Sequence, residues 1–189
     1  DNSEEIIFEM QYFVDYLLMY MVKHFTTKVT VFGYSMGGYI ALAAAAKKPE
    51  YFQSVFTFST KFTWNADIAA KEASMLNPAN MLEKIPSFVQ HLQQIHHVLP
   101  WQEIVLRTAS LLKHLGDQPL LRADVLQSIL VPVLLGVGDK NKMVSTEETM
   151  LAASSIPNSH YYVLPNTKHV FEDTNKKIVA SIIRAFANE

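Results

Sequence analysis

A chain of 189 residues, of which 49% are hydrophobic and 18% charged, has the length and apolar content of one globular domain. The formal net charge of −2, without any basic cluster, argues against nucleic acid or an anionic membrane as the main partner. The sequence has no cysteine, which excludes disulfides and thiolate metal sites and favours a reducing compartment, so we expect a cytoplasmic protein.

The first predicted element is a helix that ends near His24. Asn2 or Ser3 can cap it. Its apolar residues recur at helical spacing, at Ile6, Met10, Phe13, Leu17 and Met21. The start of the chain is acidic, and no apolar run reaches about 18 residues, so the sequence predicts neither a signal peptide nor a membrane span.

The stretch from Lys28 to Pro49 reads as strand, tight turn and helix. The strand residues from Val29 to Phe32 suit burial on both faces, and the alanine-rich segment from Tyr39 to Lys48 favours a helix. Between them lies the pattern G-x-S-x-G, centred on Ser35. The sequence therefore predicts a sharp turn between a buried strand and a helix.

A serine in so sharp a turn must adopt a strained backbone. Gly33 and Gly37 lack the Cβ atoms that we expect to collide as strand and helix approach each other. The strain would lift the Ser35 hydroxyl above the sheet, beside the backbone N–H of Met36 at the positive end of the helix. Such a turn can also serve packing alone. Whether Ser35 is a nucleophile therefore depends on which reactive residues accompany it elsewhere in the chain.

The segment Gly33-Tyr34-Ser35-Met36-Gly37-Gly38 resembles the nucleophile elbow of the α/β-hydrolase superfamily. The resemblance implies an α/β fold with a mostly parallel sheet flanked by helices. After a strand from Phe52 to Phe58, residues 65–129 carry four or five short helical segments, which resemble the helical cap of these hydrolases. We therefore expect a core of residues 1–60 and 130–189 and a cap of residues 61–129.

Four aromatic residues, one in the elbow and three in the predicted cap, are candidates for a substrate pocket. The candidates are Tyr34, Phe62, Trp64 and Trp101, although buried aromatic residues more often form a core. Three histidines in the cap, His91, His96 and His97, suggest a metal, but their spacing does not put two imidazoles on one helical face. We expect no metal.

Strand patterns return at residues 131–139 and 160–164. The first ends at Asp139, and the second leads into a loop that carries His169. Between them Ser145 and Glu148 form a capping box for a helix, and a final amphipathic helix covers residues 175–186. Asp139 and His169 thus follow the carboxyl ends of successive strands.

The order Ser35, Asp139, His169 is that of hydrolases with this elbow. A serine hydroxyl needs an imidazole to take its proton, and a carboxylate fixes the imidazole tautomer, so these three residues form a candidate triad that needs no cofactor. Asp139 could also be an ordinary turn residue, and Glu172 and Asp173 compete as partners of His169. We favour Asp139 because it ends a strand.

The predicted function is hydrolysis of an ester, thioester or related acyl bond of a small apolar substrate through an acyl-enzyme. Acyl transfer and carbon–carbon bond hydrolysis use the same residue types, and a non-catalytic ligand-binding or interaction domain is the alternative outside enzymes.

The sequence predicts only four strands. Relative to the superfamily, the N-terminal strands and a His-Gly loop are missing, which leaves the second oxyanion donor unassigned. The apolar strand from Lys28 to Phe32 would lie at an exposed sheet edge. We expect either further residues upstream of Asp1 or a homodimer through this edge.

Overall fold

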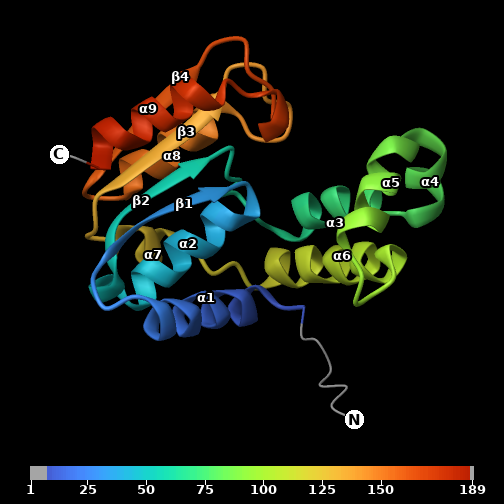
Figure 1. Cartoon of the computed structure of the whole chain (residues 1–189), viewed down its shortest axis with the longest axis horizontal. Helices are drawn as coiled ribbons and strands as arrows, with labels where there is room; N and C mark the ends of the chain where they lie inside the picture. Colours follow the sequence, from blue (N-terminus) through green and yellow to red (C-terminus); the bar gives the residue numbers. More distant parts are fainter. Residues whose placement is uncertain (1–7, 188–189) are drawn as a thin grey trace. The chain divides into compact units, whose positions relative to one another are not determined.

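The computed structural model describes residues 8–187 (Figure 1). They divide into two compact units. One contains residues 8–12 and 64–119, and its regular elements are all α-helices. The other contains residues 13–63 and 120–187 and holds the sheet. The α/β class is confirmed, and residues 120–129, which we assigned to the cap, belong to the unit that holds the sheet.

The sheet has four strands in sequence order, β1-β2-β3-β4, within the described residues. They are β1 (Val29–Tyr34), β2 (Phe52–Phe58), β3 (Val133–Gly138) and β4 (Ser159–Leu164). Every neighbouring pair is parallel, so the four carboxyl ends meet at one edge of the sheet (Figure 1). All four strands were predicted, because each is a short apolar run bounded by turn residues.

Strand β1 is an outer strand of this sheet, as predicted. Its burial differs from the expectation of two buried faces, since Phe32 is 37% exposed. The Phe32 ring packs on Phe56 at 5.4 Å and on Phe171 at 5.6 Å between ring centroids. The central strands β2 and β3 are buried almost throughout, which is why they read as continuous apolar runs.

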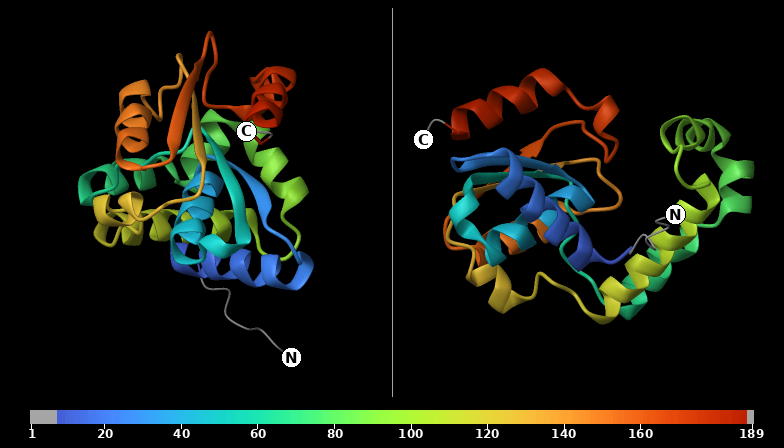
Figure 2. Two further views of the ribbon diagram at one scale, coloured as in Figure 1. Left: turned by 90° about the vertical axis from the view of Figure 1, so that its left-hand side faces the viewer. Right: turned by 60° about the horizontal axis from the view of Figure 1, so that its bottom comes forward.

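Helices cover both faces of the sheet. The helices with residues in this unit are α1 (Met10–His24), α2 (Met36–Lys47), α7 (Ala123–Gln127), α8 (Thr146–Ser155) and α9 (Lys176–Ala187). Helix α2 packs on β1 and β2, and α8 packs on β3 and β4, while α7 contacts both helices. Helix α9 covers the opposite face, where Val179 lies in one apolar cluster with Phe58 and Leu134 (Figure 2). The predicted start of the first helix lies outside the described residues.

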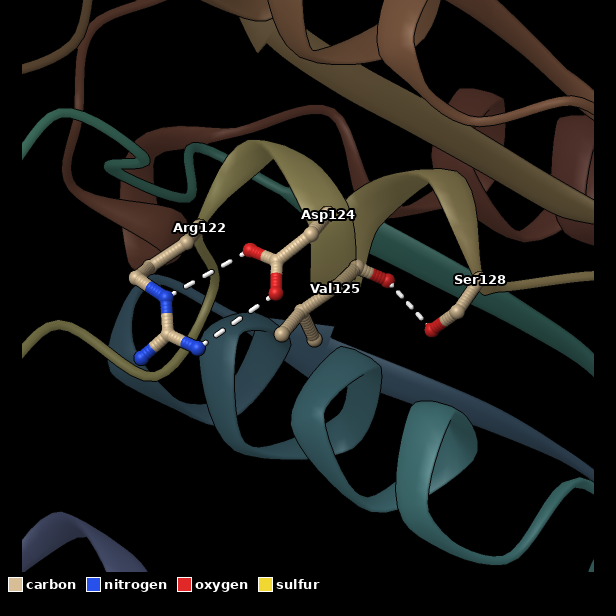
Figure 3. A network of polar contacts seen from close by, with 4 residues as sticks. All are labelled: Arg122, Asp124, Val125 and Ser128. Carbon is tan, nitrogen blue, oxygen red and sulfur yellow. Dashed lines mark hydrogen bonds and ion pairs between the residues drawn. The ribbon is translucent and has the colours of Figure 1, made fainter.

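Local contacts close both ends of the short helix α7 (Figure 3). The guanidinium of Arg122 lies 3.4 Å from the carboxylate of Asp124 and lowers the pKa of Asp124 below its ordinary value. The Ser128 hydroxyl donates a hydrogen bond to the carbonyl oxygen of Val125 at 2.7 Å. The Ser128 contact reaches a backbone carbonyl group near the end of the helix, whereas the Arg122–Asp124 pair joins two exposed side chains.

The helical unit contains α3 (Ala66–Met75), α4 (Pro78–Lys84), α5 (Pro86–Ile95) and α6 (Trp101–Asp117). Asn65 caps α3 through a hydrogen bond from the Ile68 N–H at 2.9 Å. Helices α3 and α6 pack closely, because a Cβ atom on Gly116 would lie 2.4 Å from the Cβ of Ala69. With α7, five helices occupy residues 65–129, as the sequence predicted. None of the helices in residues 8–187 is long and apolar enough to cross a membrane.

Candidate active site

Ser35 lies at the junction of β1 and α2 with a strained backbone. Its φ of 52° and ψ of −119° fall in a region that residues with a side chain seldom adopt, so the predicted strain is confirmed. The Ser35 N–H donates to the carbonyl oxygen of Phe58 at 2.8 Å, and the Thr60 hydroxyl donates to the Ser35 carbonyl oxygen at 2.9 Å. Residues of β2 and of the turn that follows it thus hold the elbow in place.

Two glycines permit the close approach of strand and helix at the elbow. A Cβ atom on Gly33 would lie 2.5 Å from the carbonyl oxygen of Gly37, and one on Gly38 would lie 2.0 Å from the Thr60 hydroxyl oxygen. A Cβ atom on Gly37 would meet nothing within 4 Å. The expectation of a collision at Gly37 is therefore wrong, and Gly38 is the second glycine that the turn requires.

His169 reaches the elbow from the loop after β4. Its Nε2 atom lies 3.3 Å from the Oγ atom of Ser35. The Tyr34 hydroxyl donates to the carbonyl oxygen of His169 at 2.9 Å, so the residue before Ser35 also anchors the loop. Burial, and secondarily the charge of Glu172, raise the pKa of Tyr34, which keeps this phenol protonated as a donor at neutral pH.

Asp139 lies at the carboxyl end of β3, as predicted, but its carboxylate contacts the backbone of the His169 loop. Its Oδ1 atom accepts a hydrogen bond from the Thr167 N–H at 3.0 Å. Hydrogen bonds from the backbone of Asn166 and Thr167 lower the pKa of Asp139. A Cβ atom on Gly138 would lie 2.1 Å from the Thr167 carbonyl oxygen, so the loop passes directly over the end of the strand.

The side chain found at Nδ1 of His169 is that of Asn141, where the sequence analysis had placed Asp139. The Asn141 Nδ2 atom lies 3.1 Å from His169 Nδ1 and donates to the Ser59 hydroxyl at 3.1 Å. Neither Asn141 nor Ser59 was a predicted site residue. The sequence rule looks for an acid after a strand, so it selects Asp139 and passes over Asn141, an amide two residues further along the same loop.

The candidate pocket residues fall in both units. Tyr34 and Phe62 belong to the unit that holds the sheet, and Trp64 and Trp101 belong to the helical unit. Trp101 is 6% exposed and packs in the core of its unit with Met81, Val89 and Val105. The structure thus gives Trp101 a packing role, and the pocket assignments stay predictions.

Glu148 has a role that the sequence did not reveal. Its N–H bonds the Ser145 hydroxyl, as in the predicted cap. Its Oε1 atom accepts hydrogen bonds from the backbone N–H groups of Phe62 at 2.8 Å and Thr63 at 2.6 Å. The carboxylate therefore fixes the segment that follows the β2 turn. Within residues 8–187 no three His, Asp or Glu side chains gather as a metal site would require.

A family model described as "Putative esterase" matches residues 8–176. The chain belongs to this esterase family. Among curated proteins it is similar to Lipase 3 of Moraxella sp. (strain TA144), with 25% identity over 180 residues, which cover 87% of this chain and 57% of the relative. This chain thus spans little more than half the length of that lipase.

Solved structures with the same fold include two hydrolases. A thermophilic esterase from Thermogutta terrifontis matches with a TM-score of 0.71 and 20% identity over 95% of this chain and 72% of its own. The meta-cleavage product hydrolase of Pseudomonas fluorescens IP01 matches with a TM-score of 0.75 and 13% identity over 100% of this chain and 75% of its own. The fold of this esterase family member is that of the α/β-hydrolase superfamily.

Proposed function

We propose that this chain hydrolyses carboxylic ester or related acyl bonds, including thioesters, of a small apolar substrate, with Ser35 as the nucleophile. The observation that carries the proposal is the 3.3 Å approach of Ser35 Oγ to His169 Nε2 at a strained strand-to-helix turn. Membership of the esterase family and the similarity to a lipase support the ester as the bond that is cleaved.

In the acylation step the Ser35 oxygen attacks the carbonyl carbon while its proton passes to Nε2 of His169. The carbonyl π bond breaks, and its electron pair forms an oxyanion beside the Met36 N–H at the first residue of α2. The tetrahedral intermediate then expels the alkoxide, which takes the proton from His169, and leaves an acyl-serine. Water then attacks the acyl-serine in the same way, with His169 as the base, and the carboxylic acid is released.

Other residues of the site would position His169. Asp139 holds the Thr167 backbone and Tyr34 holds the His169 carbonyl oxygen, so both act on the loop that carries the imidazole. Removing either should displace Nε2 from Ser35 and lower the acylation rate. Phe62, which lies in the same unit as Ser35, remains our candidate for the apolar wall that contacts the acyl chain.

One observation favours a second candidate, a ligand-binding domain with little or no catalysis. The amide of Asn141 lies 3.1 Å from His169 Nδ1, and an amide does not stabilise an imidazolium as a carboxylate does. Among enzymes, acyl transfer or carbon–carbon bond cleavage would use the same Ser35 and His169. Product analysis with a panel of esters, thioesters and acyl acceptors separates these reactions.

The test is labelling of the protein with a fluorophosphonate, followed by mass spectrometry. We expect one adduct, on Ser35, and its loss in Ser35→Ala. Ser154→Ala is the matched control, because Ser154 is an exposed serine of α8 whose hydroxyl donates to the Leu151 carbonyl oxygen of its own helix at 2.8 Å. An adduct that persists in Ser35→Ala would refute the assignment of the nucleophile.

A further inference from the structure

The Asn141 amide group has one orientation that its neighbours permit. One of its terminal atoms lies 2.9 Å from the backbone nitrogen of Met143 and 3.0 Å from that of Val144. Backbone N–H groups only donate, so this atom must be the oxygen. The other atom, which faces His169 and Ser59, is therefore the NH₂ nitrogen.

The orientation of this amide decides where the proton of a neutral His169 lies. An NH₂ group donates hydrogen bonds and accepts none, so Nδ1 of His169 has to be the unprotonated acceptor at 3.1 Å. A neutral imidazole carries one proton, and here it lies on Nε2. The Nε2–H group then points at Ser35 Oγ, 3.3 Å away, and cannot take the proton of the hydroxyl in this tautomer, so the proposed acylation has to pass through the less favoured Nδ1–H tautomer.

We infer that Asn141 is a positioning residue that holds His169 in the Nε2–H tautomer and thereby restrains the nucleophile Ser35. The inference rests on the proposed function for its effect on rate, but the tautomer follows from the hydrogen bonds alone. A serine protease in which an asparagine replaces the triad aspartate retains its geometry and loses about 10⁴-fold in kcat for the same reason.

The surroundings of Asn141 would accept an aspartate in its place. One carboxylate oxygen would keep the two hydrogen bonds from Met143 and Val144. The other would accept from a protonated Nδ1 of His169, and the Ser59 hydroxyl, whose residue is fully buried, would turn to donate to it. Asn141→Asp should therefore fold as the wild type does and move the imidazole proton to Nδ1.

The direct experiment measures the tautomer by NMR in protein labelled with ¹⁵N-histidine, at a pH where His169 is neutral. Comparison with His169→Gln assigns the signals. We expect protonated Nε2 in the wild type and protonated Nδ1 in Asn141→Asp. A wild type protonated at Nδ1 would overturn the inference and leave the proposed function intact.

The second measurement is the rate of ester hydrolysis and of fluorophosphonate labelling. Asn141→Asp should raise kcat by about 10²- to 10⁴-fold. KM should change little, because Asn141 contacts the side of the imidazole that faces away from Ser35. Asn80→Asp, which makes the same chemical change in the first turn of α4, is the control and should have the wild-type rate.

The two measurements separate the possible failures. If the tautomer of His169 switches in Asn141→Asp but neither protein shows turnover or labelling, the role of Asn141 is supported and the proposed function is refuted. A tautomer that switches in a protein whose labelling rate is unchanged refutes the restraint on Ser35.

Discussion

The Asp139 carboxylate accepts a hydrogen bond from the Thr167 N–H at 3.0 Å, two residues before His169. A backbone hydrogen bond from Asn166, and after it the one from Thr167, lower the pKa of Asp139 below its ordinary value of 3.8. The ionised form is therefore favoured in the folded state, and its stabilising contribution is present above pH 3.8 and is lost as the pH falls through the lower, folded pKa.

Asp139→Asn should therefore lower the melting temperature near neutral pH, and the difference from wild type should shrink as the pH falls below 3.8. Calorimetry across this pH range measures it. Asp173→Asn removes another exposed carboxylate of the same unit and serves as the control. A difference between wild type and Asp139→Asn that is independent of pH would show that the lowered pKa plays no part.

Removal of two buried tyrosine hydroxyls should have different effects on the free energy of unfolding. The Tyr39 hydroxyl accepts a hydrogen bond from the Leu121 N–H at 2.9 Å, whereas that of Tyr162 has no hydrogen-bond partner within the described residues. Tyr39→Phe strands a buried N–H and should cost about 1–3 kcal/mol of unfolding free energy. Tyr162→Phe should leave stability unchanged or raise it. Urea denaturation measures both, and an equal loss in the two variants would contradict this account.

The strained backbone of Ser35 should make the two simplest nucleophile knockouts unequal. Ser35→Ala and Ser35→Gly both lose the contact with His169, but alanine keeps the Cβ atom at a φ of 52° and glycine does not. We expect Ser35→Gly to be the more stable of the two by about 1–2 kcal/mol, since a residue in such a region stores about 1–3 kcal/mol. Equal urea midpoints would mean that the turn relaxes without cost.

The sequence predicted all of the strands and most of the helices of the described residues because their signals are local. An apolar run such as Phe52–Phe58 and a proline at the start of a helix, as in α4, act within a few residues. The elbow was predictable for the same reason, since a Gly-x-Ser-x-Gly run between a strand and a helix is a local signal, although the sequence did not distinguish the role of Gly37 from that of Gly38. The burial of β1 was not, because it depends on which strand lies beside it.

The site was predicted less completely, because the contacts that complete it join distant residues. Ser35 and His169 could be paired from chain order, but the choice between Asp139 and Asn141 depends on the path of one short loop over the end of β3. Glu148 illustrates the same limit: its hydrogen bond at the start of α8 is local, and its contacts with Phe62 and Thr63 are not.

The hydrogen bonds of Asn141 join three separate parts of the chain. Ser59 follows β2 and is 82 residues away in sequence, and His169 follows β4 and is 28 residues away. These contacts close large loops, and each closure costs conformational entropy of the chain. Pairing of the parallel strands brings the same segments together and offsets this cost. The polar arrangement around His169 should therefore form late in folding, and a chain that has assembled its helices but not its sheet has no reactive serine.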